Sequence, residues 1–283
     1  MQRLTRFAGK IGTSGTFGFA GVAILLLTAI ISPAFTPHDP NAIDVLHRMA
    51  LPSWEHWFGT DHLGRDLLSR HMVGTSVAMA VALGAAFIAL TGGTILGLLA
   101  AYMSGYVERA ILIAFDAIAS YPSVILALAA VAVLGSSMVT ISAVIGFALI
   151  PHFGRVARAQ TLAIRRVPFV EAEIVVGASE ARILMHHILP NIAGPLIVLA
   201  SLDIPIIIAI EAGMSFLGLG IRPPSASWGV LLQDGYQNLS ESMSPVLISC
   251  GVLAVATLAF TLLGETLRKL GDPRAVSNSA RYA

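Results

Sequence analysis

The sequence is poor in charged residues and contains a single cysteine. Only 12% of its 283 residues are charged and 56% are hydrophobic, whereas roughly a quarter of the residues of a soluble domain are charged. This composition excludes a conventional soluble enzyme. Cys250 lies in an apolar stretch, so it can form neither a disulfide within this sequence nor a thiolate metal cluster.

Signature motifs of enzymes are also absent. The sequence has no phosphate-binding Gly-x-x-x-x-Gly-Lys-Ser/Thr loop, no His-Glu-x-x-His zinc pair and no Gly-x-Ser-x-Gly nucleophile turn. His186 and His187 are neighbours, but adjacent residues of a helix point roughly 100° apart, so they do not form a metal site together. We therefore predict no catalytic residue, metal or cofactor on this chain, and any ATPase that drives it must be another chain.

Long apolar stretches dominate what is present. Each is long enough to cross a bilayer, which takes roughly 20 apolar residues. The sequence therefore predicts an all-α, polytopic membrane protein with six transmembrane helices. Basic residues precede the first stretch as in a signal peptide, but that stretch is too long and no clear cleavage site follows, so we expect an uncleaved span. The six predicted spans are residues 17–35, 77–103, 110–134, 138–154, 192–216 and 245–264.

The distribution of basic residues predicts the orientation of the chain. With six spans both termini lie on one side, and thirteen of the 17 lysines and arginines fall on that side. Cytoplasmic segments carry an excess of Lys and Arg, so we expect both termini in the cytoplasm. The cytoplasmic parts are then 1–16, a loop at 155–191 and a tail at 265–283; the extracytoplasmic parts are 36–76 and 217–244, and the transmembrane core is 77–264.

The predicted cytoplasmic loop has the local chemistry of a helix, a turn and a second helix. Pro168 suits the first turn of a helix, and Gly177 can adopt the left-handed conformation that ends it. Ser179 can cap the second helix, which we expect Pro190 to end. Such a compact projection can fit a groove on a partner, although an amphipathic surface linker would show the same pattern.

The same loop resembles the "EAA" loop of permease subunits of ATP-binding-cassette (ABC) importers. The resemblance rests on Glu171-Ala172, on Gly177 six residues after the glutamate, and on Leu189-Pro190. The sequence departs from the pattern at Glu173, where the family has alanine, and at His187, where it has an apolar residue. The resemblance implies a coupling helix that docks on an ATPase subunit, with these contact residues: Glu171, Ala172, Glu173, Gly177, Ala178, Ser179, Arg182, Leu189 and Pro190.

A second motif precedes the second predicted span. Its residues suit a helix start capped by Thr60 or Asp61, with an ion pair between Asp66 and Arg70 one turn apart. It also resembles the signature of C-type subunits of the dipeptide/oligopeptide/nickel permease family. The residues that carry this resemblance are Gly59, Thr60, Asp61, Gly64, Arg65, Asp66, Ser69 and Arg70.

Two further stretches support this resemblance. One runs from Glu211 to Gly220 and continues through Pro223-Pro224 and Trp228-Gly229; the other is Asp272-Pro273-Arg274. Trp228 stands beside an apolar patch, which suits a segment that lies at the membrane surface, where indole rings are favoured.

The resemblance implies a type I ABC importer permease in the cytoplasmic (inner) membrane. Its partners would be a B-type permease in a heterodimer, two ATPase subunits that bind ATP and magnesium, an extracytoplasmic substrate-binding protein and membrane lipid, but no nucleic acid. Di- or oligopeptide uptake by alternating access is the function it favours. Nickel, glutathione, opine or oligosaccharide uptake stay open, because no motif names the ligand.

Acidic residues within the predicted spans are the candidate translocation pathway. Asp116, Asp203 and Glu211 lie in apolar stretches, where an unpaired charge costs a few kcal/mol, so each must face a partner, a cavity or a pore. The spacing of Asp203 and Glu211 would let them share one helix face. Helix-packing contacts are an alternative, as is an ion-coupled secondary carrier that titrates these two acids. An intramembrane enzyme is less favoured, because no nucleophile and base are recognisable.

Overall fold

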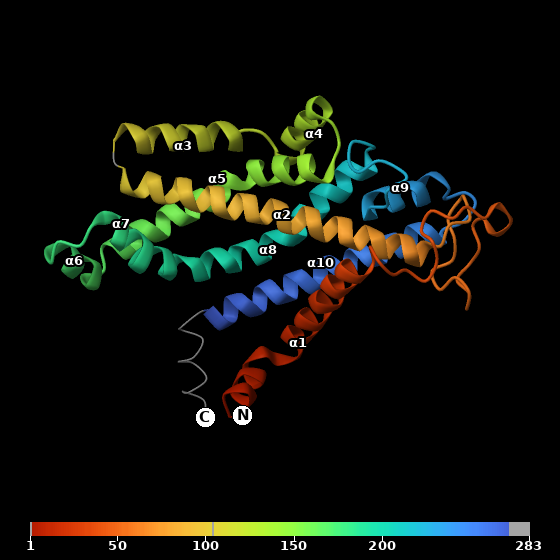
Figure 1. The fold of residues 1–283 in the computed structure, drawn as a ribbon, viewed down its shortest axis with the longest axis horizontal. Helices are drawn as coiled ribbons and strands as arrows, with labels where there is room; N and C mark the ends of the chain where they lie inside the picture. Colours follow the sequence, from red (N-terminus) through yellow and green to blue (C-terminus); the bar gives the residue numbers. More distant parts are fainter. Residues whose placement is uncertain (1, 104, 272–283) are drawn as a thin grey trace.

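The computed structural model describes residues 2–103 and 105–271, which form a helical bundle (Figure 1). Strands are absent from these residues, where pairing is limited to an isolated bridge between Thr60 and Asp66. The predicted all-α fold is confirmed. The helices are α1 (Gln2–Ile31), η1 (Val45–His47), α2 (Leu67–Tyr102), α3 (Tyr106–Ala119), α4 (Ser123–Leu134), α5 (Met138–Arg165), α6 (Pro168–Val175), α7 (Glu180–Arg182), η2 (Ile183–Ile188), α8 (Leu189–Phe216), α9 (Trp228–Gln237) and α10 (Ser244–Gly271).

Five of the described helical segments are long and apolar enough to cross a membrane, and a sixth crossing exists if α3 and α4 together count as one. The predicted span 110–134 is therefore wrong as a single helix, since α3 and α4 are bent by 85°. The break falls at Ser120–Pro122. A proline disfavours the helical conformation of the residue before it, so Pro122 ends α3 and begins the new direction of α4.

The helix ends differ from the predicted span ends. α2 begins at Leu67, inside the segment 36–76, and α5 continues to Arg165, inside the loop 155–191. α10 likewise continues to Gly271, whereas Asp272-Pro273-Arg274 lies outside the described residues. Hydropathy marks the apolar part of a helix, but a membrane helix extends beyond the hydrocarbon core into water.

Two ends of the bundle can be distinguished in Figure 1. The first carries α6 and α7, and α1 begins and α10 finishes toward it; we call it the α6 end. The second carries α9 and the connection from α1 to α2; we call it the α9 end. The arrangement brings the beginning and the end of the described chain to one side, which an even number of crossings requires.

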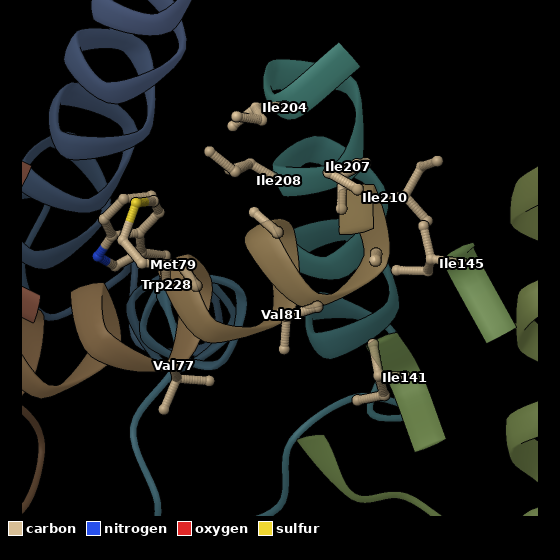
Figure 2. Close-up of a cluster of buried hydrophobic side chains, with 14 of the residues drawn as sticks. Val77, Met79, Val81, Ile141, Ile145, Ile204, Ile207, Ile208, Ile210 and Trp228 are labelled. Atoms are coloured by element: carbon tan, nitrogen blue, oxygen red, sulfur yellow. The ribbon is translucent and has the colours of Figure 1, made fainter. Parts of the chain in front are cut away.

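Close packing of α2 against α5 forms the centre of the bundle. A Cβ atom built at Gly97 would lie 2.4 Å from the carbonyl oxygen of Gly154, so the two backbones touch where both residues are small. Small residues at such contacts allow the dispersion and packing forces that hold membrane helices together. Figure 2 shows the neighbouring core, in which α2, α5, α8 and α9 contribute Val77, Met79, Val81, Ile141, Ile145, Ile204, Ile207, Ile208, Ile210 and Trp228.

Candidate functional site

The segment between α5 and α8 projects from the α6 end of the bundle (Figure 1). α6 begins at Pro168, and Gly177 has φ of +85°, the left-handed conformation expected of it. The amide of Ala178 donates to the carbonyl of Glu173 at 3.0 Å, which is the hydrogen bond that closes a Schellman turn around a left-handed glycine. The turn is therefore set by local chemistry that is readable in the sequence.

One side of α6 is anchored and the other is free. Val170 is buried in a cluster with Ile183 and Ile188 of η2, whereas Val175 and Val176 are 87% and 85% exposed. Most of the predicted coupling residues are accessible. Glu171, Ala172, Gly177, Ser179, Arg182 and Pro190 are exposed, and Glu173, Ala178 and Leu189 are half-buried.

The predicted end of the second helix is wrong. Pro190 lies in the first turn of α8 and does not stop it, because Glu180–Phe216 runs as one continuous helical segment. The π-helical stretch η2 explains this, since the amide of Leu189 donates to the carbonyl of Leu184, five residues back. The wider turn changes the hydrogen-bond register just before the residue that has no amide hydrogen to donate. Ser179 occupies the N-cap position but makes no capping hydrogen bond.

The two departures from the EAA pattern face each other. Nε2 of His187 lies 3.7 Å from Oε1 of Glu173, and the ring of Phe169 lies 6.2 Å from the ring of His187. The pair links α6 to η2 on opposite sides of the glycine turn. Both departures therefore contact each other beside the same turn.

The motif at residues 59–70 lies at the α9 end. Its structure contradicts two of the predictions made for it. The N-cap of α2 is Asp66, which accepts hydrogen bonds from the amide and the hydroxyl of Ser69 at 2.8 and 2.7 Å; it is neither Thr60 nor Asp61. The predicted ion pair between Asp66 and Arg70 does not form. Instead Oδ2 of Asp61 lies 2.7 Å from Nε of Arg65 and 3.5 Å from Nε of Arg70.

The other residues of this motif shape the loop. Gly59 and Gly64 have φ of +70° and +77°, and a Cβ at Gly64 would lie 1.7 Å from the carbonyl oxygen of Asp44. Thr60 donates its hydroxyl to the carbonyl of His47. The connection between α1 and α2 therefore folds back on the motif, which gives Gly59, Thr60 and Gly64 a structural role.

The stretch from Glu211 to Gly229 joins α8 to α9. A Cβ at Gly229 would lie 2.2 Å from the carbonyl oxygen of Ala212, so the two helices meet at their backbones. The indole ring of Trp228 does not face outward: its side chain is fully buried inside the protein, and its N–H donates to the carbonyl of His71 at 3.4 Å. This hydrogen bond and the burial of the indole ring hold α9 against α2.

α9 also supplies Asp234 to this end of the bundle. Oδ2 of Asp234 lies 3.6 Å from a guanidinium nitrogen of Arg65. Burial raises the pKa of Asp234, and the positive charges of His62, Arg70 and Arg65 act against that rise.

The structure separates the three intramembrane acids into two groups. Asp203 of α8 lies 3.5 Å from Nε2 of His152, and Asp116 of α3 lies 2.7 Å from a guanidinium nitrogen of Arg155. His152 and Arg155 lie one turn apart on α5, so they bring the two acids to neighbouring positions. The predicted pathway omitted both basic residues: His152 lies near the end of the predicted span 138–154, and Arg155 is the first residue of the predicted loop 155–191.

The surroundings of Glu211 differ from those of Asp203. Its side chain is 1% exposed, and Oε1 accepts a hydrogen bond from the hydroxyl of Ser215 at 2.7 Å. Ser215 in turn accepts from the amide of Ile221 at 3.1 Å. Glu211 therefore belongs to the buried junction between α8 and α9, and within the described residues it contacts neither α3 nor α5 by a hydrogen bond or ion pair.

Comparisons with known proteins match this architecture to one family. Residues 93–276 match the family model of the binding-protein-dependent transport system inner membrane component. The chain is 37% identical over 254 residues to the Escherichia coli protein named "Probable D,D-dipeptide transport system permease protein", which covers 90% of this chain and 85% of that one.

Two other relatives have different printed substrates. The chain is 35% identical over 261 residues to the glutathione transport system permease protein of Pectobacterium atrosepticum, covering 91% of this chain and 87% of the relative. It is 34% identical over 259 residues to the nickel transport system permease protein of Escherichia coli, covering 92% and 94%.

This chain belongs to the family of binding-protein-dependent inner-membrane transport components. It is the non-catalytic permease of an ABC importer of the dipeptide, glutathione and nickel group, with the type I importer permease fold, and it works with other subunits of that system. It is an integral protein of the inner membrane. The predicted family and fold are thus confirmed, and the ion-coupled carrier is not supported.

Proposed function

We propose that this chain carries di- or oligopeptides inward by alternating access. It forms one half of the pore, and a related B-type permease forms the other half. Two ATPase subunits bind ATP and magnesium at the α6 end, and an extracytoplasmic binding protein delivers substrate at the α9 end. The excess of basic residues toward the α6 end supports a cytoplasmic location for that end and for both termini.

The observation that carries this proposal is the continuity between the projecting turn and a membrane helix. α7, η2 and α8 form one helical segment from Glu180 to Phe216, and the exposed Val175 and Val176 precede it on the other side of the glycine turn. A force applied to this turn by a closing ATPase pair is transmitted to α8 as a rigid-body movement. Glu171 and Arg182 supply polar contacts around the apolar tip, and Ala172 adds a small exposed apolar side chain.

The intramembrane charges support a pathway along α5. His152, Arg155 and Asp116 are each about half exposed or more on the bundle surface, and charged groups at membrane depth avoid lipid. This face therefore lines a water-filled path or the contact with the second permease. Asp203 completes the set, whereas Glu211 stabilises the outer junction of α8 and α9 and has no direct contact with substrate.

Neutralising Asp203 tests this pathway. In Asp203→Asn, His152 loses its acidic partner, and the path loses a fixed negative charge in a low-dielectric region. We expect uptake of a radiolabelled dipeptide by proteoliposomes to fall about tenfold, the effect of roughly 1.4 kcal/mol, while the subunits still copurify. Glu265→Gln, which breaks an exposed pair with Arg268 at the end of α10, is the control and should transport normally. Unchanged uptake in Asp203→Asn would place the pathway elsewhere.

Co-purification tests the proposed assembly and substrate class. The chain is co-expressed with its candidate B-type permease and ATPase subunits, and ATP hydrolysis is measured in lipid with the binding protein and a panel of dipeptides, glutathione and Ni²⁺. We expect a complex whose ATPase activity is stimulated most by peptide-loaded binding protein. Stimulation by Ni²⁺ or glutathione alone would keep the importer and replace the peptide substrate.

A further inference from the structure

Two histidines and an aspartate from separate parts of the sequence converge at the α9 end. His38 follows α1, His56 lies in the connection to α2, and Asp66 caps α2. Nδ1 of His56 lies 2.9 Å from Oδ1 of Asp66, and Nδ1 of His38 lies 3.8 Å from Oδ2 of the same carboxylate. The potential ligand atoms of the three residues all lie within 4.8 Å of one another.

Hydrogen bonds within the protein do not satisfy every nitrogen of this cluster. Nδ1 of His38 is inaccessible to solvent and has no hydrogen-bond partner, although its side chain as a whole is 40% exposed. A buried nitrogen without a partner is costly. The imidazole rings of His38 and His56 lie 4.8 Å apart, and Nδ1 of each ring lies within 3.8 Å of the Asp66 carboxylate.

The distances suit a divalent metal ion. Two ligands that bind Zn²⁺ at about 2.1 Å with a tetrahedral angle between them lie about 3.4 Å apart, which falls between the 2.9 Å from His56 to Asp66 and the 3.8 Å from His38 to Asp66. Imidazole nitrogen with carboxylate oxygen is a ligand set of late first-row ions such as Zn²⁺ and Ni²⁺. His56 would exchange its hydrogen bond to Oδ1 for the metal bond, while Oδ2 keeps the bonds from Ser69 that cap α2.

A cavity of about 230 Å³ opens beside these residues. Its walls include His38, Asp66, Glu55 and the side chains of Trp54 and Trp57. The cavity gives room for the water ligands that complete the coordination of an ion held by three side chains. Glu55 adds a second negative charge, which also favours a cation.

A neighbouring cluster of potential metal ligands differs, because its carboxylates already lie next to an arginine. Asp61, His62 and Asp234 also lie within ligand distance of one another. Both of these carboxylates already face guanidinium groups, since Arg65 lies 2.7 Å from Asp61 and 3.6 Å from Asp234. The positive charge of Arg65 opposes a cation there, whereas no Lys or Arg forms an ion pair with Asp66 among the described residues.

We propose that His38, His56 and Asp66 form a binding site for a late first-row divalent cation, with Zn²⁺ as the representative ion. The bound ion ties the chain that follows α1 to the first turn of α2. The backbone amide of His38 already donates to the hydroxyl of Ser69 at 3.0 Å, so the metal closes a junction that is partly formed without it.

Calorimetric titration of Zn²⁺ into the purified, chelator-treated importer complex tests this site. We expect one ion per copy of this chain, with at least about tenfold weaker binding in His38→Ala, because loss of a metal contact typically weakens affinity by that factor or more. Co²⁺ bound at the site should show the visible absorption of a low-coordinate ion in wild type and lose it in the variant. His47→Ala is the control, since His47 is exposed, lies in the same connection and pairs with Asp44 instead.

Two results would overturn the proposal. The first is equal Zn²⁺ affinity in wild type and in His38→Ala. The second is an equal loss in His47→Ala, which would indicate binding by scattered surface histidines. If His38→Ala proves poorly folded by size-exclusion chromatography, His38→Gln replaces it, because its polar side chain fills the same half-exposed position without an imidazole ligand.

Discussion

Replacing Gly177 by valine should uncouple ATP hydrolysis from transport. Gly177 has φ of +85°, and nothing lies within 4 Å of a Cβ atom built on it, so a side chain has space but the backbone conformation is strained. For a residue other than glycine the left-handed conformation costs about 1–2 kcal/mol, and more for a β-branched side chain. The turn would relax away from φ > 0 and break the hydrogen bond from Ala178 to Glu173.

The substitution would therefore displace the exposed tip at Val175 and Val176 relative to the helical segment that continues into α8. Val175 and Val176 would no longer sit at a fixed angle to α7, so we expect substrate-stimulated ATPase activity and uptake to fall about tenfold or more, in line with the cost of the turn. Gly177→Asn is the matched control, because asparagine tolerates the left-handed region, and it should retain most activity. Normal coupling in Gly177→Val would show that the ATPase docks on another surface.

The structure of this turn could be predicted because each step depends on neighbours in sequence. Pro168 at a helix start and Gly177 at a helix end act through their own backbone preferences, and the carboxylates placed early in α6 need no distant partner. Pro190 shows where this reasoning fails. Its effect depends on the π-helical register set by the packing of Ile183 and Ile188 against α6, which local preferences do not contain.

The helix cap at Asp66 illustrates the same limit. Thr60, Asp61 and Asp66 are all good capping residues, and the sequence does not rank them. The folded loop does, because Asp61 is occupied by the amides of Leu63 and Arg65 at 2.8 and 3.0 Å, which leaves Asp66 to cap α2. The folded loop therefore decides which of these residues caps α2.

For a related reason, the sequence alone does not predict the pairs His152–Asp203 and Arg155–Asp116. Hydropathy identifies the costly charges within each span but cannot say which helices meet. An acid in one span and a base in another are matched only by the packing of α3, α5 and α8. The break between α3 and α4 was missed because an apolar average over 110–134 does not register the change of direction at Pro122.

Replacing Asp61 by asparagine should destabilise the chain more than any other single change considered for this protein. Asp61 is the partner of two buried guanidinium groups, Arg65 at 2.7 Å and Arg70 at 3.5 Å. Neutralising it removes the shorter acidic contact of both buried positive charges, although Arg70 keeps its bond to the carbonyl of Pro40 at 3.1 Å and Arg65 still lies 3.6 Å from Asp234. Breaking a buried ion pair from one side costs about 3–5 kcal/mol.

This cost should appear as a loss of thermal stability and of membrane yield. We expect the midpoint of thermal unfolding in detergent to fall by roughly 10 °C, since each kcal/mol shifts the midpoint of a chain of this size by about 2–4 °C. Glu241→Gln is the control: its pair with Arg48 is half exposed, and such surface pairs contribute about 1 kcal/mol or less. Equal midpoints for the two variants would mean that water reaches Arg65 and Arg70 in the folded protein. The loop between α1 and α2 would then be held by its glycine turns and by the Asp66 cap, and the acid–guanidinium cluster would contribute little to the α9 end.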